Sequence, residues 1–161
     1  MERNYEFRKR LEIVHKPDRR QEKIVLQPDE LLIEDGWTIL ISTRAAQLIV
    51  NVAKDLQDYL FTSMRVSVLV KRSEDLANDA LHAENVIILA AKQELTDCGA
   101  ELSVPRSYRY ICTEKRVIIC GCDEQGVGQG SYYLEDLMNL REAPVLRFGD
   151  IVREPLFSPR M

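Results

Sequence analysis

The segment 116–141 constrains the fold of this chain more than any other part of the sequence. Val117–Cys120 is a continuous apolar run that predicts a buried strand, and the glycine-spaced turn Gly121–Gly130 follows it at once. From about residue 125 to residue 141, apolar side chains then recur at helical spacing. Such a helix must bury its apolar stripe against another element, so the segment predicts a helix that packs on a sheet.

The glycine turn could bind an anion or could serve packing alone. Backbone N–H groups at the start of a helix attract phosphate. However, a Rossmann fingerprint would need a third glycine where Ser131 stands, and a Walker loop would need a lysine that the turn lacks. Asp123 and Glu124 would also repel an anion. We therefore expect no nucleotide or other cofactor, and we expect the glycines to let the helix approach the sheet, with Asp123 as its cap.

The rest of the chain predicts several strands and one more long helix. Apolar runs on both sides of Asp35-Gly36 predict a β-hairpin, and residues 107–121 predict a second one. A wide apolar stripe over residues 43–61 predicts an amphipathic helix. Val86–Ala91 is apolar throughout, which suits a strand covered on both faces. Together these elements predict an α/β domain of the α+β kind, a mixed β-sheet with two main helices packed on it.

The composition narrows the class of protein. At 161 residues, the chain is long enough for one domain with its own core. Its 22 basic and 26 acidic side chains give a net charge of −4, which argues against a nucleic acid as the partner. No apolar run reaches the roughly 18 residues that span a membrane, so we expect no membrane partner. Without a signal peptide, the sequence favours a cytoplasmic protein, or one whose signal peptide has been removed.

The sequence offers few metal ligands. One Cys-x-Cys pair is present, but no second close pair and no His-x-His completes a zinc site of about four ligands. His15 and His82 stand alone in the sequence. We therefore expect buried free thiols and no metal site. The four cysteines are Cys98, Cys112, Cys120 and Cys122.

Two adjacent acid pairs, Asp123-Glu124 and Glu135-Asp136, come closest to a pair of catalytic carboxyl groups. The side chains of adjacent residues on a strand or helix point in different directions. Neither pair can therefore place its two carboxyl groups on either side of one substrate bond. Helix capping and solvation explain these acids better. No H-E-x-x-H motif and no Ser, His and Asp grouping can be argued from the sequence. We therefore expect no catalytic residue in this chain.

The two ends of the chain differ in character. Residues 1–22 mix basic and acidic side chains, which predicts either a solvated edge element or short helix, or a basic arm for an acidic partner. The exit segment contains Ile151, Leu156 and Phe157, which would leave an apolar patch exposed at a free end. We expect this exit segment to pack against a further domain.

The order of elements in residues 107–160 resembles the small domain that precedes the catalytic barrel in family 20 β-N-acetylhexosaminidase-like glycoside hydrolases and their relatives, the α-glucuronidases among them. The resemblance rests on the strand Val117–Cys120, the acidic glycine turn Asp123–Gly126, the helical run Leu134–Met138 and the exit Asp150–Arg160.

This resemblance implies a zincin-like α/β layer over residues 23–149 that carries no catalytic residue. Residues 1–22 would be a charged appended segment, and residues 150–161 a linker into a catalytic barrel of the same polypeptide, absent from this chain. It also implies a carbohydrate as the substrate of the whole enzyme, with Arg160 at the sugar-binding mouth. The alternative is a free-standing α/β module that binds a ligand or a protein without catalysis.

Overall fold

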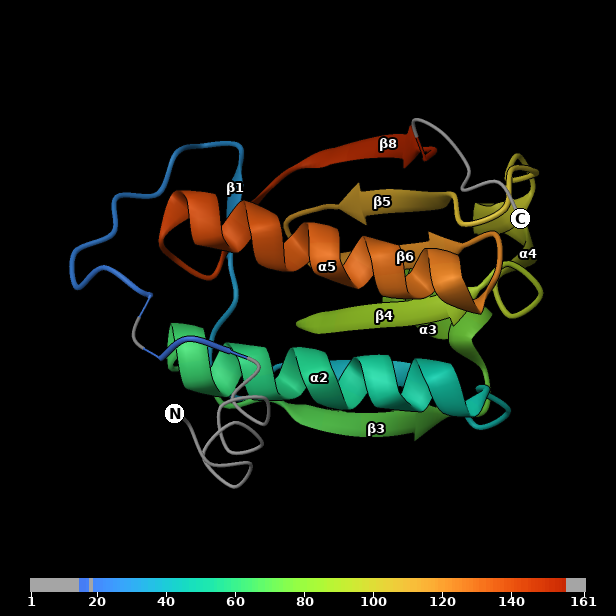
Figure 1. Cartoon of the computed structure of the whole chain (residues 1–161), viewed down its shortest axis with the longest axis horizontal. Coiled ribbons are helices and arrows are strands. Elements are labelled where there is room, and N and C mark those ends of the chain that lie inside the picture. Colours follow the sequence, from blue (N-terminus) through green and yellow to red (C-terminus); the bar gives the residue numbers. More distant parts are fainter. Residues whose placement is uncertain (1–14, 18, 156–161) are drawn as a thin grey trace, which may run out of the picture.

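The computed structural model describes residues 15–17 and 19–155 and consists of a β-sheet layer with helices on both faces (Figure 1). Its strands are β1 (Glu30–Leu32), β2 (Thr38–Ser42), β3 (Leu69–Ser73), β4 (Val86–Ala91), β5 (Tyr108–Cys112), β6 (Arg116–Gly121), β7 (Val145–Arg147) and β8 (Gly149–Arg153). Six of them form one sheet in the order β3-β2-β4-β6-β5-β8, and β1 pairs with β7 in a small second sheet. In the large sheet, β3, β2, β4 and β6 run parallel, and β5 and β8 are antiparallel to their neighbours.

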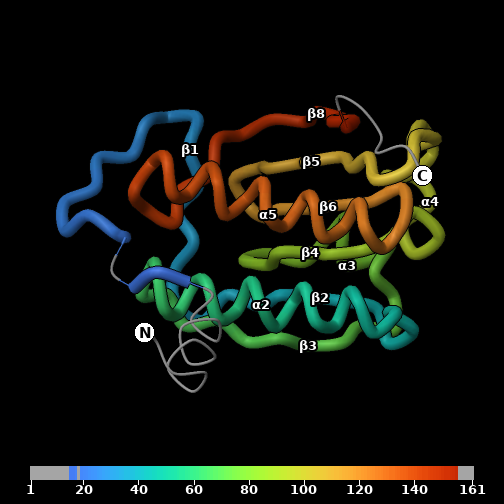
Figure 2. Tube along the Cα trace, in the orientation of Figure 1, coloured from blue at the N-terminus to red at the C-terminus, as the bar shows by residue number. Residues whose placement is uncertain are grey.

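Two long helices, α2 (Gln47–Met64) and α5 (Glu124–Arg141), lie side by side on one face of the large sheet (Figure 2). The other face is covered by the short helices α3 (Leu76–His82) and α4 (Thr96–Gly99). A mixed sheet with two main helices packed on it is the predicted fold class, which the structure confirms. Within the described residues, no helix combines the length and the apolar character needed to cross a membrane.

Strand β4 joins the two layers of the core. All six of its residues are buried. Ile87 and Leu89 belong to the core beneath α2 and α5, whereas Ile88 and Ala90 belong to the smaller core beneath α3 and α4. Burial of one large aliphatic side chain contributes about 1.5–3 kcal/mol. The prediction of a strand covered on both faces is confirmed.

Of the two predicted hairpins, one is confirmed and one is wrong. β5 and β6 pair antiparallel, as expected. β1 and β2, which lie on either side of Asp35-Gly36, do not pair: β1 joins β7, and β2 lies parallel between β3 and β4. The reason is the loop before β3. The backbone N–H of Ser67 donates to Asp35 Oδ1 (2.8 Å), and the N–H of Gly36 donates to the Ser67 carbonyl (2.9 Å). The turn therefore leads the chain from the small sheet into the large one.

Two element boundaries also differ from the prediction. α2 begins at Gln47, later than expected, because the Ser42 hydroxyl accepts a hydrogen bond from the Arg44 N–H (3.0 Å) and shapes a turn instead of capping the helix. α2 ends where Arg65 takes a left-handed conformation with φ of 55°. Residues 149–153, at the start of the expected linker, form the edge strand β8, which pairs with β5.

Helix α5 lies close to the sheet because glycines face the sheet. A Cβ atom on Gly126 would collide with the Ser107 carbonyl oxygen, and one on Gly130 would collide with the Ile119 side chain. Gly128 has space around it: a Cβ there would lie 3.7 Å from Val52 Cγ2, an ordinary contact. Packing therefore accounts for these glycines without a ligand.

We expect Gly126→Ala to lower the free energy of unfolding by about 1–3 kcal/mol, because the added methyl group meets backbone atoms that cannot move aside. Gly128→Ala is the matched control in the same helix. There the methyl group has room, so better helix propensity should raise stability by up to about 1 kcal/mol. Urea unfolding followed by circular dichroism measures both changes. Equal effects of the two substitutions would contradict the close approach of α5.

Candidate functional site

The N-terminal strap, which we define as residues 15–17 and 19–21, lies across the C-terminal part of α2 and the end of α5. The backbone N–H of Arg19 donates to the Ser63 carbonyl (2.9 Å), and that of Gln21 donates to the Glu142 carbonyl (2.8 Å). The Ser63 hydroxyl donates to the Lys16 carbonyl (2.6 Å). These bonds tie the strap to both long helices. Residues 1–14, most of the charged segment 1–22, lie outside the described residues.

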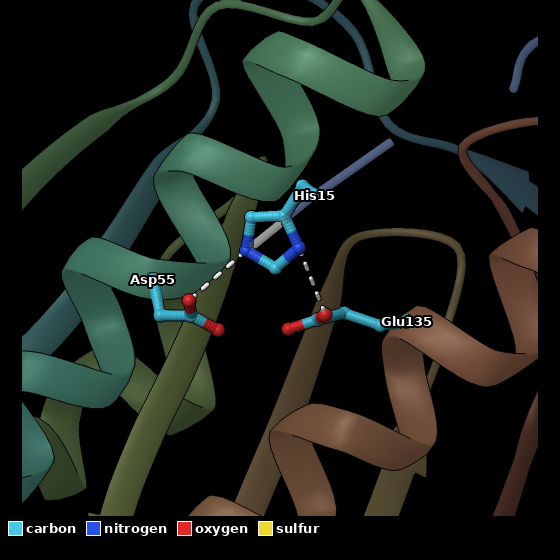
Figure 3. Close-up of side chains that lie close together, drawn as sticks. All are labelled: His15, Asp55 and Glu135. Atoms are coloured by element: carbon cyan, nitrogen blue, oxygen red, sulfur yellow. Dashed lines mark hydrogen bonds and ion pairs between the residues drawn. The ribbon is translucent and has the colours of Figure 1, made fainter. Parts of the chain in front are cut away.

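The strap buries His15 between two carboxyl groups (Figure 3). His15 Nε2 lies 3.0 Å from Asp55 Oδ1 on α2, and His15 Nδ1 lies 3.7 Å from Glu135 Oε1 on α5. The His15 side chain is only 6% exposed. The expectation of a solvated N-terminal element is therefore wrong at His15. We call these three residues the His–Asp–Glu cluster.

Tyr59 holds the two helices together beside this cluster. Its ring packs edge-on against His15, with the ring centroids 5.3 Å apart. Its hydroxyl lies 2.6 Å from Asn139 Oδ1 and 3.1 Å from the Glu135 carbonyl oxygen, either of which accepts its hydrogen bond. Burial raises the pKa of Tyr59 well above its usual range, so the hydroxyl stays a donor. Tyr59 on α2 thus holds α5 at a defined distance beside the His–Asp–Glu cluster.

Glu135 is the buried acid of the cluster, with 7% of the residue exposed. Burial first, and the charge of Asp55 second, raise the pKa of Glu135 to about 8, which keeps its carboxyl group mostly protonated at neutral pH. Within the described residues, Glu135 Oε2 has no hydrogen-bond partner, and neither has the buried hydroxyl of Ser131 one helical turn earlier. Two buried oxygen atoms at or beside the cluster, Glu135 Oε2 and Ser131 Oγ, therefore each have room for a further hydrogen bond or ligand.

Sequence reasoning explained Glu135 by solvation, which is wrong. Its neighbour Asp136 is exposed, so the two acids do point apart as expected. Glu135 instead continues the buried stripe of α5, eight positions after Val127 and four after Ser131. An acid in register with the apolar stripe of a helix was the signal available in the sequence. Nothing in the sequence pointed to His15 or Asp55 as its neighbours.

At the glycine turn, the start of α5 is occupied by the chain itself. Asp123 Oδ1 accepts a hydrogen bond from the Gly126 N–H (2.7 Å), and its Oδ2 accepts one from the Arg106 N–H (3.1 Å). The predicted capping role of Asp123 is confirmed. A carboxylate therefore stands where a phosphate would have to bind, which disfavours anion binding at this turn.

The cysteines are free thiols, and none of them joins a possible metal site. Cys112 and Cys120 are buried, which raises the pKa of Cys112 to about 11 and that of Cys120 to about 12. Within the described part of the chain, the one group that could hold a metal ion is the His–Asp–Glu cluster, which sequence reasoning did not identify. Arg160, the predicted substrate contact, lies outside the described residues.

The chain is similar in fold to several solved structures. No protein-family model and no curated protein matches it. It is similar to a GH115 4-O-methyl-α-glucuronidase with specificity for decorated arabinogalactans, with a TM-score of 0.57 and 13% identity over 78% of this chain and 18% of that one. It is also similar to a GH138 enzyme targeting pectin rhamnogalacturonan II, with a TM-score of 0.51 and 13% identity over 74% of this chain and 15% of that one.

These neighbours support the resemblance at the level of the fold. The chain shares the fold of part of two glycoside hydrolases and spans less than a fifth of either. A β-N-acetylhexosaminidase from Bacteroides fragilis aligns with 12% identity over 85% of this chain and 24% of that one, but its TM-score of 0.43 is too low to indicate a shared fold. The two matches with TM-scores above 0.5 support a domain fold that occurs in glycoside hydrolases, and neither of them is described as a family 20 enzyme.

The raised pKa of Glu135 predicts how stability depends on pH. The folded chain keeps a proton that the unfolded chain, with a pKa of 4.5 for this group, would release. The contribution of Glu135 to stability is therefore full below about pH 4.5 and is lost as the pH rises through about 8. Glutamine resembles the protonated acid and does not titrate. The urea midpoint of Glu135→Gln, relative to that of the unmodified chain, should therefore rise between about pH 5 and about pH 9.

The control for this measurement is Asp136→Asn, which removes the exposed neighbouring acid on the same helix. Its urea midpoint should keep a nearly constant offset from that of the unmodified chain. If Glu135→Gln behaved in the same way, Glu135 would not titrate as the structure indicates. Both variants would be measured in the presence of a metal chelator.

Proposed function

We propose that this chain is a non-catalytic N-terminal accessory domain of a glycoside hydrolase, which supports the catalytic barrel of the same polypeptide. The observation that carries the proposal is the match to the GH115 α-glucuronidase, which covers 78% of this chain but only 18% of the enzyme. A domain that aligns with so small a part of a large enzyme is more suited to an accessory role than to the whole reaction. In the complete protein, Arg160 would contact the carbohydrate substrate, as the sequence resemblance implies.

The described residues argue against catalysis by the chain itself. Glycoside cleavage commonly needs two carboxyl groups about 5–9.5 Å apart with the sugar between them. In the His–Asp–Glu cluster, His15 contacts both Asp55 and Glu135. Oxygen atoms of the two carboxyl groups lie within 4.8 Å of each other, which is closer than the separation that places a sugar between them. The cluster is therefore unsuited to glycoside hydrolysis.

The exposed edge of the large sheet is the surface that we propose for contact with the barrel. β8 pairs with β5 on one side only and has the free edge of the sheet on its other side. Its residues Ile151 and Val152 are 38% and 44% exposed. An edge strand with apolar side chains is favourable to cover with another domain. This strand also forms the start of the predicted linker, residues 150–161.

The second candidate is a free-standing module that binds a polar ligand. A groove of about 760 Å³ lies where the parallel strands β2, β3 and β4 end, and its lining includes Arg44, Glu74, Asp75 and Glu94. In open α/β sheets, ligands bind outside the carboxyl ends of the strands. With three acids and one arginine, this groove favours a neutral or cationic ligand over an anion. A stop codon after residue 161 in the natural gene would favour this candidate, and a barrel-sized continuation would favour the accessory domain.

We expect residues 1–161 alone to hydrolyse no aryl glycoside, because the family resemblance implies that the catalytic acids belong to the barrel and not to this domain. The full-length polypeptide, assayed beside it on the same panel of nitrophenyl glycosides, should release nitrophenol. Turnover by the isolated chain would overturn the non-catalytic assignment. Inactivity of the full-length polypeptide on every substrate of the panel would count against a glycosidase as the parent enzyme.

If β8 supports a second domain, Val152→Lys in the full-length protein should destabilise both domains together. The lysine would lose the burial of valine, which is worth about 1.5–3 kcal/mol, and would place a charge in the contact. Leu81→Lys, at an exposed position of α3, is the matched control and should leave both melting transitions unchanged. Calorimetry of the two transitions is the measurement. If Val152→Lys also left both unchanged, the contact would not lie at β8.

A further inference from the structure

We propose that His15, Asp55 and Glu135 bind a divalent transition-metal ion of the zinc class, which would join the N-terminal strap to α2 and α5. The inference is independent of the proposed glycosidase role. It rests on the composition of the cluster, on its geometry, and on a buried oxygen atom that lacks a partner.

The cluster has suitable ligands at suitable distances. One potential ligand atom from each of the three residues lies within 4.8 Å of those from the other two. A zinc ion bound at about 2.0–2.2 Å by imidazole nitrogen and carboxylate oxygen holds neighbouring ligand atoms about 3–4 Å apart. The distance of 3.0 Å from His15 Nε2 to Asp55 Oδ1 is close to this spacing, and the 3.7 Å contact of Glu135 is made with the other ring nitrogen, Nδ1.

A second observation points to a missing ligand. Glu135 Oε2 is buried and has no hydrogen-bond partner within the described residues. Figure 3 shows the two carboxyl groups on opposite sides of a gap beneath the imidazole. Buried polar atoms are nearly always satisfied, so the two carboxyl groups at this gap need either the proton that Glu135 holds at neutral pH or a cation that displaces it. A cation between the carboxyl groups would satisfy Glu135 and Asp55 together.

The ligand types select the class of metal. Imidazole with carboxylates suits Zn²⁺, Co²⁺ or Mn²⁺ better than Mg²⁺ or Ca²⁺, which prefer oxygen ligands throughout. Three protein ligands leave a further position for water. The Asp55 side chain is 31% exposed, so the cluster is open to solvent on this side. The two nitrogens of His15 now face different carboxyl groups, so the ring must turn to direct one nitrogen at the ion.

The test is a calorimetric titration with Zn²⁺ alone, after the chain has been treated with a chelator and the chelator removed. We expect one ion per chain. Loss of a partner in the second coordination sphere costs about 10–100-fold in metal affinity, so His15→Ala and Glu135→Gln, which each remove a direct ligand, should each cost at least about 100-fold. His82→Ala is the matched control, because it removes the other histidine of the chain, which is exposed on α3. It should bind Zn²⁺ as the unmodified chain does.

A second measurement needs no variant at the cluster. The chain has two histidines, so the imidazole NMR signals of His15 can be assigned by their persistence in His82→Ala. Zn²⁺ should shift the His15 signals and leave those of His82 in place, and Co²⁺ should bind without thiolate charge-transfer absorption. Unshifted His15 signals at saturating Zn²⁺, cobalt–thiolate absorption, or equal Zn²⁺ affinity of His15→Ala and the unmodified chain would each overturn the proposal.

Discussion

The depth at which α5 lies on the sheet determines much of the rest of the structure. Gly126 and Gly130 allow the first half of this helix to contact the backbone and side chains of the strand layer directly. At that depth its flank meets α2, and Tyr59 can bridge the two helices through Asn139. The buried position of Glu135 depends on the same seam. A larger residue in place of either glycine would lift α5 and open the seam between the helices.

Local patterns in the sequence predicted the layers of the fold but not all the strand pairing. The continuous apolar run Val86–Ala91 predicted β4 as a strand buried on both faces, because successive side chains of a strand point to opposite faces and here both are apolar. The Asp35-Gly36 turn was misleading. Its local chemistry favours a hairpin, but hydrogen bonds to Ser67, distant in sequence, direct it otherwise. The pairing of strands that are distant in sequence, such as β1 with β7, cannot be recognised from the residues of either strand alone.

The candidate site was largely beyond sequence reasoning for the same reason. His15 and Asp55 are 40 positions apart, and Glu135 lies on another helix. Each residue alone has an ordinary explanation, and only the seam between the helices brings them together. The capping role of Asp123 was predictable because cap and helix are adjacent in sequence. Glu135 was partly predictable, since it lies in register with the buried stripe of α5.

The strap and the small sheet connect the beginning of the described chain with its end. Gln21 bonds to Glu142, which lies 121 positions later, and β1 pairs with β7. During synthesis, β2, α2, β3 and β4 can assemble as soon as they leave the ribosome, because their partners are close in sequence. The strap can dock on α2 early through Ser63, but β1 must wait for β7, and the strap completes its contacts only when Glu142 has emerged. The pairing of β1 with β7 is therefore among the last steps of folding, although β1 is the first strand of the described chain.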